Sequence, residues 1–185
     1  DRHGRVDRLL AEGSSHPGDL ARRIVDENAR YNLGHVARTI NVPMLALDFL
    51  GRRNRWRLSF DKRGEETLDG RTVWVVDFKE RERPTLVKTP EGRERPARGT
   101  VWIDPVEGSV WRTNLAFDGG RGDAGPATTI AVRYRREVAL GLLVPDEMHE
   151  VYRMENRADA PEQIDAVARY TNFRQFRTSA RIVGR

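Results

Sequence analysis

The chain of 185 residues carries a formal net charge of +5, with 33% charged residues and a mean hydropathy of −0.69. It is long enough for one domain with a buried core, and because it contains no cysteine, disulfides and thiol nucleophiles are excluded. No apolar run approaches the roughly 20 residues of a membrane-spanning helix. The 28 acidic residues are interleaved with the basic ones, which argues against nucleic acid as a partner and leaves polyanion binding as a third hypothesis.

The chain is predicted to begin with a short extra segment, followed by the main domain. Because the sequence starts at Asp1 and not at Met, we expect residues 1–18, which end in a Gly- and Ser-rich linker, to be the remnant of a longer chain. Residues 19–185 are expected to form a single domain. Its first helix is capped by Asp19 and extends to about Asn32.

A second short helix is predicted between Asn41, as its cap, and Gly51, which ends it. Pro43 lies near its first turn, a position that proline tolerates. The residues from Met44 to Leu50 are apolar nearly all round this helix, which predicts burial on more than one side.

After this helix the apolar residues follow the two-residue period of β-strands. Asp69-Gly70 is a strong signal for a hairpin turn, and Pro145 suits an edge strand or a bulge. No helix separates the strands, so they predict one antiparallel sheet whose concave side the second helix fills. The expected strands are 55–61, 71–80, 86–88, 100–104, 109–117, 128–135, 142–151 and 164–176.

The hairpin of residues 99–117 is the centre from which we build this sheet. Its turn is Pro105-Val106-Glu107-Gly108, a four-residue loop with Pro and Gly. In the first strand, alternation places Val101 and Ile103 on one face and Trp102 on the other. In the return strand one face is expected to carry Trp111, Thr113, Leu115 and Phe117.

Four phrases of the sequence carry a resemblance to a known superfamily. They are Trp102-Ile103-Asp104-Pro105 with Gly108 and Val110-Trp111-Arg112, then Gly70 to Val76, Leu143 to Met148, and Tyr170 to Arg174. In this order they resemble the half-barrel domains of the bacterial outer-membrane lipoprotein-sorting (LolA/LppX-like) superfamily, over roughly Asn54 to Phe176. A group of predicted bacterial envelope proteins with this half barrel is more similar still, since its helical entry resembles Ala29 to Gly34 and Asn41 to Pro43.

The resemblance implies an α+β fold in which a curved antiparallel half barrel of about eight to ten strands wraps around one or two N-terminal helices. It further implies a periplasmic or outer-membrane-associated domain. Because the sequence contains no complete catalytic or cofactor-binding motif, we expect this domain to be non-catalytic and without a cofactor. The expected ligand is an apolar or lipidic molecule, or a lipidated partner, held in the hollow of the half barrel. The alternative is a structural or interaction subunit of a larger envelope assembly, with an envelope protein as its partner and no small ligand.

Apolar side chains of the second helix and the first two strands are the candidate lining of that hollow. The alternative for the same residues is a plain core, closed to the density of a crystal. A lipid pocket, by contrast, leaves several hundred Å3 unfilled. The candidate ligand-binding residues are Leu45, Phe49, Trp56, Leu58, Phe60, Trp74, Val76 and Phe78.

The sequence contains several partial catalytic or metal-binding patterns. Residues 120–125 match G-x-G-x-x-G, but Pro126 and a strand follow instead of a helix, so we expect a loop. His149-Glu150 lacks the second histidine of a zinc motif, and no metal site is expected. Asp104, Asp146 and Glu147 could form a carboxylate pair, but Asp104 stands at a turn entry and is expected to accept backbone hydrogen bonds.

Two arginine pairs, Arg55 with Arg57 and Arg133 with Arg135, are expected to occupy one face of their strands. The favoured interpretation is a solvated sheet surface with acidic partners on neighbouring strands. The alternative is attraction to anionic lipid headgroups or to an acidic partner.

Overall fold

Strands make up most of the part of the chain that the structure describes, a computed structural model of residues 42–89, 91–119, 125–154 and 162–174. The chain divides into two units, 1–41 and 42–185. The whole first unit lies outside the described residues. The expected helix from Asp19 to Asn32 and the expected boundary after residue 18 therefore lie outside them as well.

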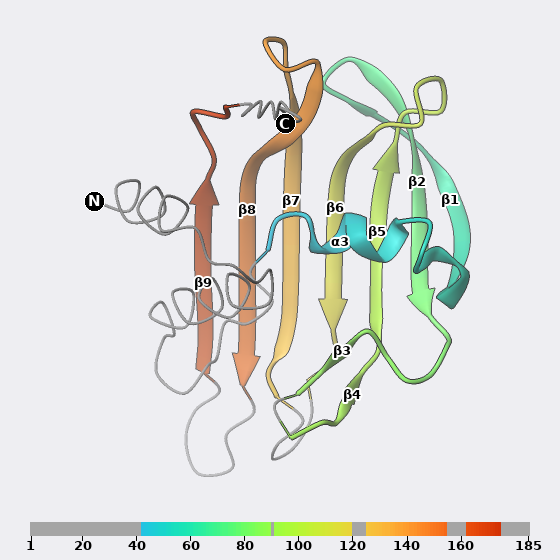
Figure 1. The fold of residues 1–185 in the computed structure, drawn as a ribbon, viewed down its shortest axis with the longest axis vertical. Helices are drawn as coiled ribbons and strands as arrows, with labels where there is room; N and C mark the ends of the chain where they lie inside the picture. Colours follow the sequence, from blue (N-terminus) through green and yellow to red (C-terminus); the bar gives the residue numbers. More distant parts are fainter. Residues whose placement is uncertain (1–41, 90, 120–124, 155–161, 175–185) are drawn as a thin grey trace, which may run out of the picture. The chain divides into compact units, whose positions relative to one another are not determined.

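Seven strands form an open antiparallel sheet in the order β1-β2-β5-β6-β7-β8-β9 (Figure 1). The predicted antiparallel sheet is thus confirmed, with β1 and β9 as its edges, and β3 and β4 pair separately. The strands are β1 (Leu58–Leu68), β2 (Arg71–Glu80), β3 (Val87–Lys88), β4 (Glu94–Arg95), β5 (Ala97–Ile103), β6 (Val110–Phe117), β7 (Ala127–Glu137), β8 (Leu142–Met154) and β9 (Glu162–Arg169).

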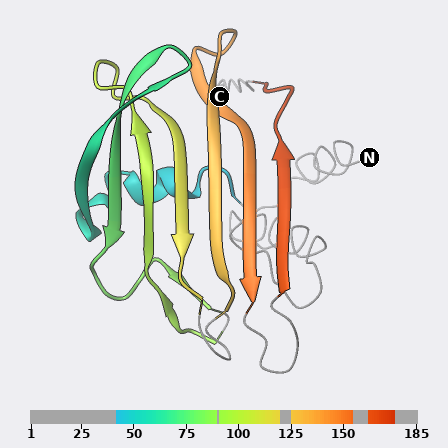
Figure 2. The same cartoon turned by 180° about the vertical axis from the view of Figure 1, so that it is seen from behind.

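One short helix, α3 (Leu45–Leu50), lies across one face of the sheet, which we call the helix face (Figure 1). The ring of Phe49 packs on Phe117 of β6, with centroids 6.4 Å apart. The opposite side, seen in Figure 2, is called the back face. No helix in the described part of the chain is long and apolar enough to cross a membrane.

The helix begins three residues later than the sequence predicts. The chain from Val42 to Met44 instead forms a turn, in which the amide of Leu45 donates to the carbonyl of Val42 at 3.0 Å. Within α3 only Ala46 and Phe49 are fully buried, so burial on more than one side is not what the structure shows. Gly51 ends the helix, as predicted.

Both predicted hairpin turns are present. Asp69 and Gly70 adopt φ values of 49° and 77°, the left-handed pair of a two-residue turn that suits Asn, Asp and Gly. At the second turn, Asp104 Oδ1 accepts hydrogen bonds from the amides of Val106 and Glu107 at 2.8 and 3.1 Å. The side chain thereby holds the loop that joins β5 to β6, as its place at a turn entry predicts.

Alternation places most of the core on the helix face. The pairs Val101↔Thr113 and Thr113↔Val132 lie in one row across β5, β6 and β7, and all three side chains are buried. Pro145 lies beside a register shift between Arg133 and Tyr134, which confirms the predicted bulge.

The predicted face of Trp111 in β6 is wrong. Its neighbours Val110 and Arg112 pair with Ile103 and Trp102, so that Trp111 is an extra residue at a bulge. Its indole joins a second apolar cluster, on the back face, instead of the row of Thr113, Leu115 and Phe117. The cluster consists of Val73, Val75, Trp102 and Trp111, with Leu68 and Leu143 packed against it.

Several strand boundaries differ from the prediction, among them the start of β1 and the end of β9. Residues Arg55–Arg57 form a 3-10 turn, so the first strand starts at Leu58. The last strand ends at Arg169 and does not reach Phe176; residues 170–174 are not strand, and Asn172 has a left-handed φ of 59°. A left-handed residue interrupts the extended backbone that a strand requires.

Candidate functional site

The predicted apolar stripe lies on one side of the sheet. Register pairs Phe60 with Phe78, and alternation puts Leu58, Trp74 and Val76 on the same, helix face. Leu45 and Phe49 belong to α3, and Trp56 lies in the 3-10 turn that precedes β1. The structure therefore brings the five strand residues of the stripe onto the face that α3 covers.

Part of this stripe is packed core. Phe49, Phe78 and Leu58 are 1%, 3% and 9% exposed, and Leu45 is half-buried. The ring of Phe78 lies over Gly99 of β5, so closely that a Cβ at Gly99 would be 2.7 Å from two ring carbons. These residues leave no room for a ligand and account for the core interpretation of the stripe.

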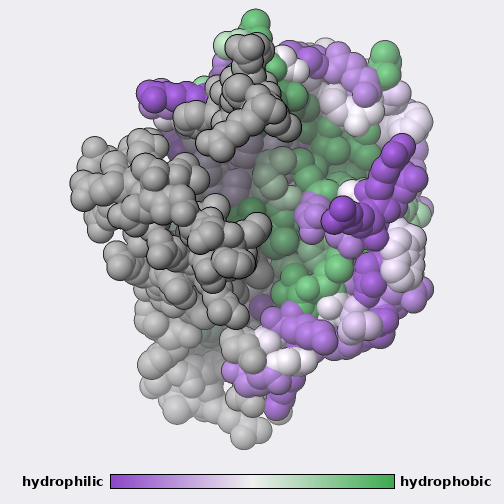
Figure 3. Space-filling view, in the orientation of Figure 1, coloured by the Kyte–Doolittle hydropathy of each residue, from purple (hydrophilic) through white to green (hydrophobic). Residues whose placement is uncertain are grey.

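The rest of the stripe is open to solvent. Phe60 and Trp74 are 50% and 39% exposed, and Val76 between them is half-buried. We call these three residues the apolar edge, because β1 is an edge strand of the sheet. Trp56 in the adjoining turn is 63% exposed. Figure 3 shows apolar surface on the helix face, bordered by polar side chains.

A charged pair borders the apolar edge. Lys62 Nζ lies 4.2 Å from the centroid of the Trp74 ring and 2.9 Å from Glu65 Oε1. The hydrogen bond from Lys62 lowers the pKa of Glu65. The ammonium therefore lies over the indole ring as a cation–π contact, and Trp74 as a whole is 39% exposed.

The buried polar groups of the helix face serve the fold. The Glu80 carboxylate, 4% exposed, accepts the amides of Leu86 at 2.9 Å and Ala97 at 3.1 Å, with Arg57 Nε 3.7 Å away. It thus joins the end of β2 to the segments that lead into β3 and β5. Arg57 faces this carboxylate from a 3-10 turn, so the expected strand face shared with Arg55 is wrong.

The other predicted arginine pair has the acidic partners that the favoured interpretation requires. Arg133 Nη2 lies 2.7 Å from Asp146 Oδ2, and Arg135 Nε lies 3.6 Å from the other oxygen. Glu147 binds Arg169 at 3.0 Å. Asp104, in contrast, accepts hydrogen bonds from the amides of its own turn.

His149 and Glu150 occupy opposite faces of β8. The imidazole lies 3.3 Å from Asp165 on the back face, whereas Glu150 is buried on the helix face. Neither the residues around them nor any other described part of the chain groups three potential ligands for a metal. Most of the glycine-rich stretch, residues 120–124, lies outside the described residues.

Sequence reasoning missed a polar groove on the back face, because the residues that form it come from four strands. Their alternation is visible in the sequence, but their register is not. Comparison with known proteins finds no matching family model, no similar curated protein and no similar solved structure.

Proposed function

We propose that this chain is a non-catalytic domain of the bacterial cell envelope, periplasmic or associated with the outer membrane, that binds an acyl chain or a lipidated partner. In this proposal its sheet is a half barrel like that of the lipoprotein-sorting superfamily. The observation that supports it is the apolar edge: Phe60 and Trp74 lie half in water on the same face as a packed core.

The apolar edge is where a ligand would gain most from burial. Covering apolar surface is worth about 25 cal/mol per Å2, or roughly 1.5–3 kcal/mol for a phenylalanine-sized side chain. Phe60 and Trp74, which stay partly exposed, gain only part of this burial free energy on folding. Phe49 and Phe78, which are almost fully buried, gain nearly all of it. An acyl chain along β1 and β2 would extend the existing core to the sheet edge.

The position of the four tryptophans provides the test. Trp74 belongs to the apolar edge and Trp56 to the adjoining turn, whereas Trp102 and Trp111 lie buried on the back face. A brominated fatty acid quenches an indole only at short range, so we expect it to quench the emission of the purified chain. Substituting Trp74→Phe should remove most of this quenching, and the matched control Trp102→Phe should retain it.

Native mass spectrometry of the purified chain supplies the second measurement. A co-purifying lipid that is lost on solvent extraction supports the proposal. Absence of both lipid and quenching would contradict it, as would quenching that depends on Trp102 and not on Trp74. In that case the interaction subunit without a small ligand becomes the better description.

A further inference from the structure

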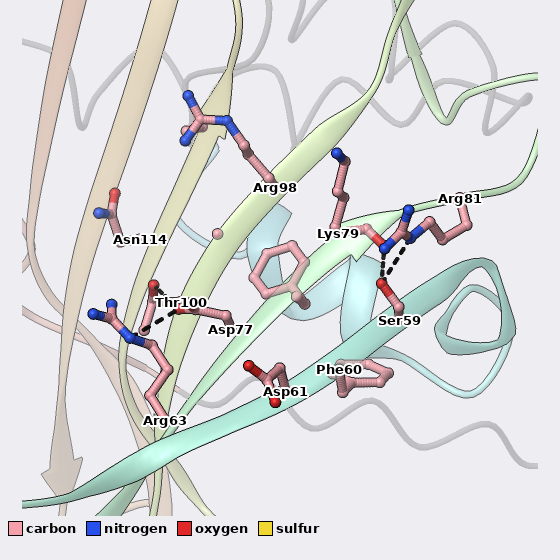
Figure 4. Close-up of a pocket in the computed structure, with 13 residues that line it drawn as sticks. Ser59, Phe60, Asp61, Arg63, Asp77, Lys79, Arg81, Arg98, Thr100 and Asn114 are labelled. Atoms are coloured by element: carbon pink, nitrogen blue, oxygen red, sulfur yellow. Dashed lines mark hydrogen bonds and ion pairs between the residues drawn. The ribbon is translucent and has the colours of Figure 1, made fainter.

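The back face carries a polar groove of about 530 Å3 that crosses β1, β2, β5 and β6 (Figure 4). Most of its lining belongs to the back face, and Phe60 of the apolar edge contributes to its border at β1. Its lining includes four cationic side chains, Arg63, Lys79, Arg81 and Arg98, and two carboxylates, Asp61 and Asp77. The groove therefore has an excess of positive charge.

Strand register sorts these charges into two rows. In the first row Lys79 lies directly opposite Ser59 on one side and Arg98 on the other. In the second row Asp77 lies opposite Asp61 and Thr100. Like charges directly opposite each other on antiparallel strands are destabilising, so the folded chain concentrates cations at one end of the groove at some cost.

The cationic end is incompletely neutralised. Arg98 binds Asp118 at 2.6 Å, and Arg81 Nε donates to the uncharged hydroxyl of Ser59 at 3.0 Å. Lys79 makes no ion pair with any described residue, although together with Arg98 it lowers the pKa of Asp118. Asp118 thus offsets the charge of Arg98 and Lys79, Arg81 has only an uncharged partner, and Figure 4 shows Lys79 and Arg98 pointing away from Asp61 and Asp77.

The second row ends in an unsatisfied acceptor. Asp77 is occupied by the Thr100 hydroxyl at 2.7 Å and by Arg63 at 3.6 Å. The next residue in the row is Asn114, whose Oδ1 is buried without a hydrogen-bond partner. A buried polar atom without a hydrogen-bond partner destabilises the folded chain. A hydroxyl or amino group of a ligand in the groove would satisfy it.

We propose that this groove binds a phosphate monoester whose organic part carries a hydroxyl or amino group. The phosphate lies between Lys79, Arg81 and Arg98, where charge-assisted hydrogen bonds are strongest. The donor of the organic part reaches Asn114. The same chemistry, a phosphate monoester beside a free hydroxyl, is offered by a soluble phosphate ester and by the headgroup of a lysophosphatidic acid, and the test distinguishes these sources.

Calorimetric titration of the full chain with glycerol 3-phosphate and with inorganic phosphate is the first arm. We expect both to bind, glycerol 3-phosphate more tightly. Lys79→Gln and Arg98→Gln should each reduce the affinity for both ligands about tenfold or more. Asn114→Leu should reduce the affinity for glycerol 3-phosphate and leave the affinity for inorganic phosphate unchanged, because it removes only the acceptor for the organic part.

The matched control is Arg153→Gln. Arg153 lies on the same face, on β8, and hydrogen-bonds Gln163 at 2.9 Å, outside the groove. The substitution Arg153→Gln removes one positive charge, as Arg98→Gln does, but outside the groove. This variant should therefore bind both ligands with the affinity of the unchanged chain. Circular dichroism and thermal unfolding establish that each variant is folded, and Lys79→Arg, which keeps the charge, should retain binding.

Flotation with phosphatidylcholine vesicles, with and without lysophosphatidic acid, is the second arm. Binding to the soluble ester alone identifies a soluble ligand, and additional binding to lysophosphatidic acid that Lys79→Gln abolishes identifies the headgroup. The proposal is overturned if neither arm shows binding, or if Arg153→Gln weakens binding as much as Lys79→Gln. Vesicle binding that survives in the Lys79→Gln, Arg98→Gln double variant would also overturn it.

Discussion

The hydroxyl of Tyr134 donates a hydrogen bond of 2.7 Å to the carbonyl oxygen of Pro43. This contact joins the turn before α3 to the middle of the sheet. A helix of six residues is too short to be stable alone, so its position depends on such contacts. The hydroxyl of Thr113 lies 3.5 Å from the same tyrosine oxygen and completes the arrangement.

Tyr134→Phe is expected to destabilise the chain by about 0.5–1.5 kcal/mol, the usual value of one hydrogen bond. The phenyl ring of the variant still fills the space of the tyrosine ring, while the Pro43 carbonyl loses its hydrogen-bond donor. Urea unfolding followed by circular dichroism measures the loss. Thr113→Val is the matched control: it removes only the longer contact and should cost less. Equal costs for the two variants would contradict the assigned role of the Pro43 contact.

Alkaline titration gives a second measurement on Tyr134. Burial raises the pKa of its phenol above the ordinary value of 10. Because the folded state holds this proton more tightly than the unfolded state, the stabilisation is complete below the unfolded pKa and is lost as the pH rises through the folded one. The absorbance of tyrosinate should therefore show one late-ionising group, which Tyr134→Phe removes.

The turn at Asp104 predicts an acid-dependent contribution to stability. Hydrogen bonds from the amides of Glu107 and Val106 lower the pKa of this carboxyl. Its stabilisation is therefore present above the unfolded pKa of about 3.9 and is lost as the pH falls through the folded value. Asp104→Asn keeps an oxygen acceptor but does not titrate, so unfolding measured between pH 5 and about 2 should depend less on pH.

The control for this prediction is Asp61→Asn. Asp61 makes no hydrogen bond or ion pair with any described residue, and the substitution removes the same charge from the same sheet. Because Asp61 lies directly opposite Asp77, its replacement removes a like-charge contact and not a stabilising one, so it should not reduce the acid dependence of stability. If Asp61→Asn reduces the pH dependence of the free energy of unfolding below pH 5 as much as Asp104→Asn, net charge and not the turn accounts for the effect.

Much of this sheet is predictable because its signals are local. The strand from Arg71 to Glu80 has the predicted bounds, since alternation and the Asp69-Gly70 turn mark it from within the segment. The backbone hydrogen bonds of Asp104 follow equally from its position before Pro105. The apolar stripe of β1 and β2 shares one face as expected, because alternation alone decides the face.

The features that were mispredicted or missed depend on pairing between strands. Trp111 changes face because its strand gains one residue against β5, and no residue near it in the sequence indicates where that shift falls. Lys79 and Arg98 meet only through register. Likewise, the difference between buried Phe78 and exposed Phe60 depends on their strands, the second and the edge strand of the sheet, and on Gly99, which admits the ring.

Gly99→Ala is expected to destabilise the chain by about 1–3 kcal/mol, the range for overpacking a core. The new methyl group would lie 2.7 Å from the Phe78 ring and closer still to the backbone oxygen of Asn114, so a smaller side chain at Phe78 cannot relieve the whole clash. Gly64→Ala is the matched control, because a Cβ there meets no atom within 4 Å. Alanine also lowers the conformational entropy of the unfolded chain. Gly64→Ala should therefore leave the free energy of unfolding in urea unchanged or raise it by up to about 1 kcal/mol. A Gly99→Ala variant as stable as Gly64→Ala would contradict the close approach of both the Phe78 ring and the Asn114 carbonyl to Gly99, and with it the packed half of the apolar stripe.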